Sequence, residues 1–307
     1  MKYLIGIDAG GTKTKCAVAD LTGIILLTET GKSVNYLIAG ADKTSANLFG
    51  LISQCLKKLN INFSEVKQIV IGIAGAGRLK DAQQLERSLI QYSKSKKVKI
   101  NSVKVLSDAL IALEGAFPGK PGCILIAGTG SILFGKDVKG KIHHVGGFGR
   151  LIGDEGSGYS IGRKALQAVS GELDGRAVKT LMTKKLFDQM NISDSEELIT
   201  KIYKENFDIA SIAPLVISSA EKNDKPAQRI LNEEADELAF HVISMMKKMN
   251  LKKLNVAFIG GLIGNKNYYS TLLTKKIKSS LPNVTISKPR FSPVEGAILM
   301  AKENLNE

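Results

Sequence analysis

The stretch IGIDAGGTKTKC, residues 5–16, decides the fold of this chain. Apolar residues alternate with others up to Asp8, two glycines follow, and alternation resumes from Lys13. A period of two is typical of β-strands, and paired glycines are typical of tight turns. The stretch therefore predicts a hairpin that joins a strand over 2–10 to a strand over 13–20.

The strand after the glycines excludes two familiar nucleotide motifs. A Walker P-loop and a dinucleotide fingerprint both need a helix directly after their glycines. A hairpin can still bind phosphate, because glycine lets successive backbone N–H groups converge on one point and leaves no Cβ in the way. AGGT (9–12) is by itself more often an ordinary turn, so both interpretations stay open. In the phosphate-binding interpretation, Asp8 at the end of the strand holds Mg²⁺ through water.

The order of predicted elements begins again in the middle of the chain. The first half reads as strands 2–10, 13–20 and 23–30, helix 44–59, strand 68–75, helix 80–93, strand 103–108 and helix 109–116. The second half opens within 122–147 with a strand, the turn AGTGS (127–131), a second strand, a short turn and a third strand. It continues with helices 157–169 and much of 175–247, strand 255–263, helix 268–279, strand 283–288 and helix 293–303. This repetition indicates a duplicated architecture.

Two α/β domains with mixed sheets follow from the repeat. The turn composition of 119–122 marks the seam. We expect an N-terminal domain over 1–117 and a C-terminal domain over 118–307, and the terminal helix 293–305 is a candidate to pack back on the N-terminal domain. The ligand is expected in the cleft between the domains, where such pockets commonly form.

Asp108, in VLSDALIAL, lies where a strand ends and an apolar helix begins. Aspartate favours the N-cap position of helices, which is one explanation. The other is a general base at the carboxyl end of a sheet strand, where α/β folds bind ligands. The spacing alone leaves these two alternatives open.

Two further glycine-rich stretches stand out. VGGFGRLIGDEGSGYSIGRKAL (145–166) places Asp154 and Glu155 just before a predicted helix, where acidic residues suit the helix dipole. So many glycines cost conformational entropy, which indicates close backbone approach to a partner. FIGGLIG (258–264) ends a strand and is either a tight turn or a flat surface for an adenine ring.

Composition excludes several other classes. Lys+Arg 43 against Asp+Glu 29 gives a net charge of +14, but the lysines are spread and the densest cluster, 94–99, lacks aromatic neighbours, so no nucleic-acid partner is expected. No apolar run reaches the roughly 18 residues of a membrane span, and no signal-peptide pattern is present, so we expect a cytoplasmic protein. Cys16, Cys55 and Cys123 read as buried free thiols, and His143 and His144 lack a third metal ligand.

These stretches, in this order, resemble the sugar kinase, actin and heat-shock-chaperone superfamily. Within it, the segment 145–166, together with 217–231 and 293–301, is similar to the N-acetylglucosamine kinase branch, grouped with the BadF/BcrA-type ATPases. The resemblance implies two ribonuclease-H-like (actin-like ATPase) domains with mixed five-stranded sheets. It also implies a homodimer that uses ATP and Mg²⁺ to phosphorylate an amino sugar.

The resemblance also implies roles for individual residues. Asp108 would accept the proton of the sugar 6-hydroxyl. The implied ATP-binding residues are Gly10, Gly11, Thr12, Lys13, Gly128, Thr129, Gly130, Ser131, Gly260 and Gly261. The implied sugar-binding residues are Asn35, Asp108, Gly147, Phe148, Gly149 and Asp154. The family often has tryptophan where this chain has Phe148, which leaves the preferred sugar open.

N-acetylglucosamine is the favoured substrate, and glucosamine, a muramic-type sugar and glucose are alternatives. From another class, an ATPase activator of an acyl-CoA dehydratase would need cysteines around an iron–sulfur cluster. A non-catalytic sugar sensor is a third alternative, although no DNA-binding appendage is visible. The cysteine-rich zinc motif of another sugar-kinase group is absent from the sequence.

Overall fold

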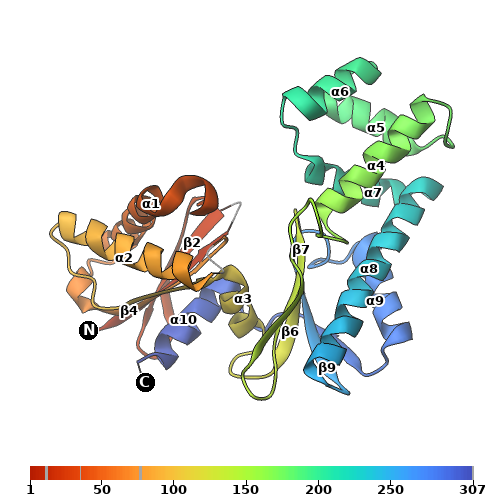
Figure 1. Ribbon diagram of the computed structural model, residues 1–307. Coiled ribbons are helices and arrows are strands. Elements are labelled where there is room, and N and C mark those ends of the chain that lie inside the picture. Colours follow the sequence, from red (N-terminus) through yellow and green to blue (C-terminus); the bar gives the residue numbers. More distant parts are fainter. Residues whose placement is uncertain (11–12, 35, 76–77, 306–307) are drawn as a thin grey trace. The chain divides into compact units, whose positions relative to one another are not determined.

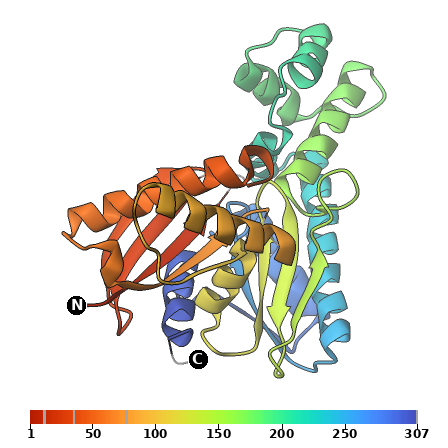
Figure 2. The ribbon, with the colours of Figure 1, turned by 60° about the vertical axis from the view of Figure 1, so that its left-hand side comes forward.

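The structure, a computed structural model, describes residues 1–10, 13–34, 36–75 and 78–305. The chain forms two compact units, one made of Met1–Lys120 with Pro289–Glu307 and the other of Pro121–Lys288. Each unit is a mixed β-sheet with helices packed on it, as Figures 1 and 2 show element by element. The predicted α/β fold class with two five-stranded mixed sheets is confirmed.

The sheet of the first unit has the order β3-β2-β1-β4-β5. β1 and β2 form the predicted hairpin, with Ala9 opposite Thr14 at its mouth, and β3 continues the antiparallel pairing. β4 and β5 run parallel to β1, so the carboxyl ends of these three strands lie at one edge. The strands are β1 (Tyr3–Ala9), β2 (Lys13–Asp20), β3 (Ile25–Lys32), β4 (Val66–Ile73) and β5 (Val103–Ser107).

Helices cover both faces of this sheet, because the strands are apolar on both sides. Ile5 and Ile7 belong to the core that α1 and α2 cover, whereas Leu4 belongs to a second core formed with α3 and α10. The helices are α1 (Tyr36–Lys58), α2 (Leu79–Ser95), α3 (Asp108–Ala116) and α10 (Pro293–Glu303), with a short 3-10 helix η1 (Phe63–Glu65).

α10 packs closely against α3 and β1 at two glycines, where the neighbouring backbone leaves no room for a side chain. A Cβ on Gly296 would lie 2.0 Å from the carbonyl oxygen of Ile111 in α3, and one on Gly6 in β1 would lie 2.8 Å from the carbonyl oxygen of Val294. The Phe291 N–H, just before α10, donates to the carbonyl oxygen of Gly115 at 2.8 Å. α3, the helix that begins with Asp108, is therefore held directly by a segment from the other end of the chain.

The second unit repeats the sheet of the first. Read from its antiparallel end, its order β8-β7-β6-β9-β10 has two antiparallel pairs followed by two parallel pairs, as in the first sheet. The strands are β6 (Gly122–Ala127), β7 (Ser131–Lys136), β8 (Ile142–Gly146), β9 (Leu254–Ile259) and β10 (Val284–Ser287). The helices are α4 (Gly158–Leu173), α5 (Leu181–Met190), α6 (Ser195–Lys204), α7 (Ala213–Ala220), α8 (Lys225–Met249) and α9 (Tyr268–Ser280), with a 3-10 helix η2 (Ile209–Ile212).

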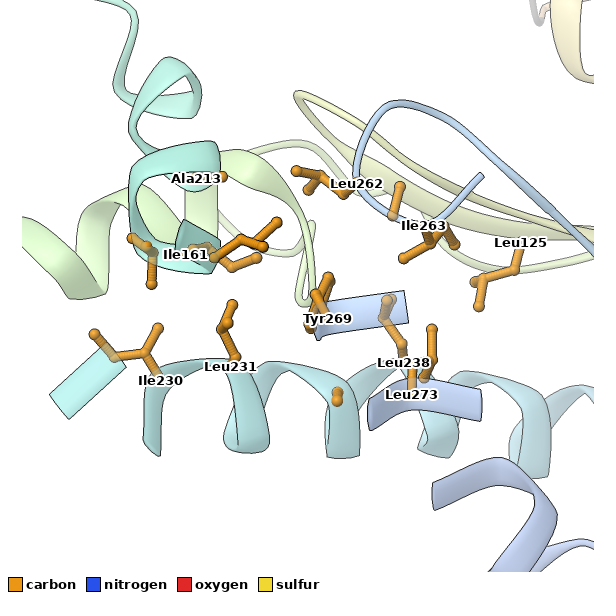
Figure 3. Packing of buried hydrophobic residues seen from close by; sticks show 14 of the residues in the cluster. Leu125, Ile161, Ala213, Ile230, Leu231, Leu238, Leu262, Ile263, Tyr269 and Leu273 are labelled. Atoms are coloured by element: carbon orange, nitrogen blue, oxygen red, sulfur yellow. The ribbon is translucent and has the colours of Figure 1, made fainter. Parts of the chain in front are cut away.

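A single hydrophobic cluster joins these helices to the sheet. Ile161 of α4, Leu231 of α8 and Tyr269 of α9 are fully buried members of it, and Figure 3 shows them with Leu125 of β6. Burial of such side chains stabilises the unit by about 1.5–3 kcal/mol for each large residue. α4, α8 and α9 are thus packed together in one core, and the loop that precedes α4 lies against this core.

Most expected elements are found with ends shifted by a few residues, and three of these shifts concern the segments near the candidate site. α1 begins at Tyr36 instead of residue 44, because Gly40 with φ 71° joins a short helical segment to the main helix. β5 ends at Ser107, one residue before the expected end. β9 ends at Ile259 instead of residue 263, because Gly260 adopts φ +103° and turns the chain.

The expectation of buried free thiols is confirmed for Cys16, Cys55 and Cys123. Within the described residues, no helix has both the length and the apolar character that crossing a membrane requires.

Gly296→Ala should lower the free energy of unfolding by about 1–3 kcal/mol, because the added methyl group meets backbone atoms that cannot move without displacing α3. Gly50→Ala is the matched control, since Gly50 is also a helical glycine but has no atom within 4 Å of its Cβ position. That control should raise stability by about 0.5–1 kcal/mol through helix propensity. Urea denaturation of both variants measures this, and equal effects would contradict the packing argument.

Candidate functional site

Two carboxylates lie at the carboxyl edge of the first sheet. Asp8 is the last residue but one of β1, and Asp108 is the first residue of α3, directly after β5. Ser107 is the N-cap of α3, and its side chain accepts a hydrogen bond from the Leu110 N–H, so the N-cap explanation for Asp108 is wrong. The Asp108 carboxylate is left to accept from the neighbouring Ala109 N–H at 2.9 Å.

Both carboxylates are harder to ionise than ordinary aspartates. Burial and the negative charge of Asp108 raise the pKa of Asp8 to about 6, against the opposing charges of Lys15 and Lys13. Burial also raises the pKa of Asp108, which the Ala109 N–H partly offsets. Two poorly solvated carboxyl groups that repel each other suit proton transfer and attract a cation.

This arrangement fits Mg²⁺. The ion usually takes one or two carboxylates and keeps several waters or phosphate oxygens, instead of a cage made only of protein groups. Asp8 with Asp108 beside it offers that donor set, and the described residues contain no group of three or more His, Cys, Asp or Glu side chains able to hold a metal. Asp8 remains the residue we expect to hold it.

The first hairpin is described only in part. The Gly10 N–H donates to the Lys13 carbonyl oxygen at 3.1 Å, which closes the turn. Gly11 and Thr12, predicted to bind ATP, and Asn35, predicted to bind the sugar, lie outside the described residues.

The second hairpin joins β6 to β7 through Gly128, Thr129 and Gly130. The Gly128 N–H donates to the Gly130 carbonyl oxygen at 2.9 Å, while the N–H groups of Thr129 and Gly130 donate to no other group in the described part of the chain. These two donors are free for an anion. The Ser131 hydroxyl donates to the Glu155 carbonyl oxygen at 2.6 Å, so its proton holds the hairpin to the following loop.

The glycine-rich loop between β8 and α4 packs against this hairpin. Asp154 is buried, and its carboxylate lies so close that a Cβ on Gly130 would be 2.8 Å from it. It accepts from the Ser131 N–H at 3.4 Å, and burial raises its pKa. Of the glycines that predicted close approach, Gly158 approaches this hairpin, since a Cβ there would lie 3.0 Å from the Gly128 carbonyl oxygen.

The other residues of this loop that were predicted to bind the sugar are Gly147, Phe148 and Gly149, and their surroundings differ from those of Asp154. Gly147 and Gly149 both adopt positive φ, and Gly147 packs against Ile132 of β7. Phe148 is 67% exposed within the second unit. The loop thus combines a fixed end at Asp154 with an exposed aromatic side chain.

The turn after β9 also reaches the second hairpin. A Cβ on Gly260 would lie 2.2 Å from the Ala127 carbonyl oxygen, and the Leu262 N–H donates to that same oxygen at 3.3 Å. Gly261 has no atom within 4 Å of its Cβ position. The structure therefore brings Gly260 to the residue from which the second hairpin starts.

Sequence reasoning missed a pocket of about 390 Å³ beyond this turn. Apolar Phe258 and Ile286 line it together with polar Asn265, Thr274 and Lys288. These residues come from β9, β10, α9 and the loop between β9 and α9, so no local pattern gathers them. The run of Ser270, Thr271 and Thr274 on one side of α9 is the available signal.

Two sheets of one order, each opening with a glycine hairpin, define the actin-like fold. The model of the BadF/BadG/BcrA/BcrD ATPase family matches residues 5–301. The chain belongs to this family.

Named relatives span the full chain. The chain is 35% identical to the N-acetylmuramic acid/N-acetylglucosamine kinase of Clostridium acetobutylicum, over 98% of this chain and 99% of that protein. It is 31% identical to the N-acetyl-D-glucosamine kinase of Dictyostelium discoideum, over 98% of each. A crystal structure of a Chromobacterium violaceum protein has the same fold, with a TM-score of 0.77 and 24% identity over 98% of this chain and 99% of that one.

Asp8→Asn should stabilise the protein without ligand at pH 7.5 but not at pH 4. The folded-state pKa of about 6 exceeds the ordinary value of 3.8, so the folded state keeps a proton that the unfolded state has lost, and stability falls as the pH rises between these values. Asparagine does not ionise, so the variant does not lose this stability as the pH rises. Its free energy of unfolding at pH 7.5 should be about 1–3 kcal/mol higher than that of the unchanged protein.

Urea denaturation at the two pH values, in metal-free buffer, measures the difference. Asp188→Asn, at an exposed position of α5, is the control and should change stability by less than about 0.5 kcal/mol at either pH. A gain for Asp8→Asn that is the same at pH 4 and pH 7.5 would show that its charge is not the cause.

Proposed function

We propose that this protein is an ATP-dependent sugar kinase that transfers the γ-phosphoryl group to the 6-hydroxyl of an amino sugar, with N-acetylglucosamine as the preferred acceptor. The observation that carries the proposal is the pair Asp8 and Asp108 at the carboxyl edge of the first sheet. The ATPase family and the names of the two curated relatives support the reaction class.

Asp108 is the proposed general base. Its burial raises the carboxyl pKa, which makes the carboxylate a better proton acceptor than an exposed one. It takes the proton of the sugar 6-hydroxyl as that oxygen attacks the γ-phosphorus. The bond from this phosphorus to the bridging oxygen breaks, and ADP leaves with the bonding electrons.

Asp8 is the proposed ligand, through water, of Mg²⁺. The bound ion would neutralise the charge of the phosphates. Lys13 and Lys15, whose charges lower the pKa of Asp8, lie near enough to add positive charge at the same edge.

The hairpins are the proposed phosphate-binding elements. In the second hairpin, the Thr129 and Gly130 N–H groups have no other partner among the described residues, which favours them as donors to phosphate oxygens. Gly128 gives this turn its shape, and Ser131 holds it in place. In the first hairpin, Gly10, Gly11, Thr12 and Lys13 are assigned by resemblance.

Gly260 and Gly261 are proposed to receive the adenosine. The pocket beside them is large enough for an adenine ring and ribose, and its mixture of apolar walls and a few polar groups is typical of small-molecule sites.

The sugar is proposed to contact Asn35, Gly147, Phe148, Gly149 and Asp154, besides the base. The exposed ring of Phe148 could stack on a pyranose. N-acetylmuramic acid is a second candidate substrate. Arg150, beside Phe148, lies over the Tyr159 ring at 5.6 Å, and its guanidinium offers a partner for the carboxylate that this sugar carries.

The alternative of a dehydratase activator is not favoured. Cys16, Cys55 and Cys123 are free and fully buried, on β2, α1 and β6, and none is positioned on the surface to hold a cluster. A homodimer, which the resemblance implies, and a cytoplasmic location, which the sequence leads us to expect, complete the proposal.

Asp108→Asn should lower kcat for sugar phosphorylation by about 10²–10⁴-fold, because the 6-hydroxyl then loses its proton acceptor. ADP affinity, measured by calorimetry, should stay within about threefold of the unchanged protein, since the substitution leaves the hairpins intact. Asp81→Asn, also in the first turn of a helix of this unit, is the control and should keep full activity. Full activity of Asp108→Asn would remove Asp108 from the mechanism.

A coupled ADP assay over a sugar panel tests the acceptor. N-acetylglucosamine should be phosphorylated, and its 6-deoxy analogue should release no ADP yet inhibit competitively, because it keeps the binding groups and lacks the attacking oxygen. N-acetylmuramic acid, glucosamine and glucose in the same panel rank the alternatives. Turnover of the 6-deoxy analogue would exclude the 6-hydroxyl as the acceptor.

A further inference from the structure

Gly156, in the glycine-rich loop before α4, has both of its backbone polar groups bound by buried side chains from other helices. Its N–H donates to a carboxylate oxygen of Glu234 in α8. Its carbonyl oxygen accepts from the hydroxyl of Tyr269 in α9 at 3.0 Å. Side chains from two helices far away in the sequence thus hold the two sides of one loop residue.

Glu234 is a charged side chain with 1% of its surface exposed. Its other oxygen accepts from the Ser160 hydroxyl at 2.9 Å and pairs with the Lys164 ammonium group at 2.9 Å. A buried carboxylate is costly unless such partners surround it, and apolar residues of the same size would often be at least as stable. The cost suggests that Glu234 does more than fill the core.

Gly156 is also restrained by its backbone conformation and by close packing. Gly156 adopts φ +77°, and a Cβ there would lie 2.2 Å from the Leu238 side chain of α8. Tyr269 is fully buried beside Leu238 in the same cluster, as Figure 3 shows. Gly156 is therefore packed closely against α8, and the two hydrogen bonds fix the loop to α8 and α9.

Gly156 also lies between two sets of bonds to the second hairpin. Just before it, Asp154 accepts from the Ser131 N–H, and the Glu155 carbonyl oxygen accepts from the Ser131 hydroxyl. Just after it, the Gly158 N–H donates to the Gly128 carbonyl oxygen at 2.7 Å, and the Tyr159 N–H donates to that of Thr129 at 3.2 Å. Movement of Gly156 would therefore move the hairpin.

We propose that Glu234 and Tyr269 are positioning residues, which clamp Gly156 and so hold the second hairpin in the conformation that binds nucleotide phosphates. The phosphate-binding part of this inference rests on the proposed function. The mechanical part, that the clamp restrains the hairpin, does not. In this proposal, Glu234 and Tyr269 make no contact with the nucleotide phosphates. Each acts on the hairpin through its hydrogen bond to Gly156.

Tyr269→Phe tests the clamp, since phenylalanine keeps the buried ring and removes only the hydroxyl donor. Hydrogen exchange of the ligand-free protein should become about 10-fold faster in residues 127–131 and 145–158, with β4 of the first unit unchanged. ADP affinity, measured by calorimetry well below the unfolding temperature, should fall about 5- to 50-fold. A residue that only stabilised the fold would lower the melting temperature and leave both readouts unchanged.

Tyr268→Phe is the matched control, because it makes the same change at the neighbouring residue of α9, and it should alter neither readout. Ser160→Ala is a milder second variant, which removes one donor to Glu234 from the first turn of α4, and it should shift both readouts in the same direction by less. Unchanged exchange and ADP affinity in folded Tyr269→Phe would overturn the proposal.

The exchange measurement needs no substrate. If the unchanged protein phosphorylates no sugar but Tyr269→Phe loosens the hairpin, the proposed function fails and the clamp stands. If the unchanged protein is an active kinase and Tyr269→Phe leaves the hairpin protected, the clamp fails and the function stands.

Discussion

The close contact of α10 with α3 and β1 is the constraint on which the first unit depends. Gly296 and Gly6 allow backbone to approach backbone where any side chain would intrude. Because α3 packs against α10 on one face of the sheet, its first residue, Asp108, is held at the edge where β1 places Asp8. The electrostatic properties of that pair are thus a consequence of packing more than of local sequence.

The two units use the same sheet for different chemistry. In the first, the carboxyl edge carries ionisable side chains whose poor solvation shifts their proton equilibria. In the second, the equivalent edge carries backbone N–H groups and glycines, and its acidic residue, Asp154, is turned inward against the hairpin. The same sheet architecture thus carries, in the proposed mechanism, the proton acceptor and cation ligand in one unit and the anion-binding N–H groups in the other.

Much of the fold could be predicted from the sequence, because strand alternation and the repeated glycine turns are local signals. Asp108 was misplaced by one residue, since Ser107 and Asp108 are both good helix caps and only the three-dimensional structure shows that serine takes this role. Close backbone approach by the glycine-rich stretch 145–166 was predicted, but its partner was not. The clamp formed by Glu234 and Tyr269 could not be predicted, because in the sequence each is an ordinary residue of its own helix.

The composition of the first unit from two distant segments has a consequence for biosynthesis. Residues 121–288 form a continuous unit and can fold as they leave the ribosome, whereas the sheet face of Leu4 and Val70 is covered only by α3 until α10 has been made. During that interval an apolar surface is exposed to chaperones and to other nascent chains. The contact between α3 and α10 therefore forms only after the whole of the second unit has been translated.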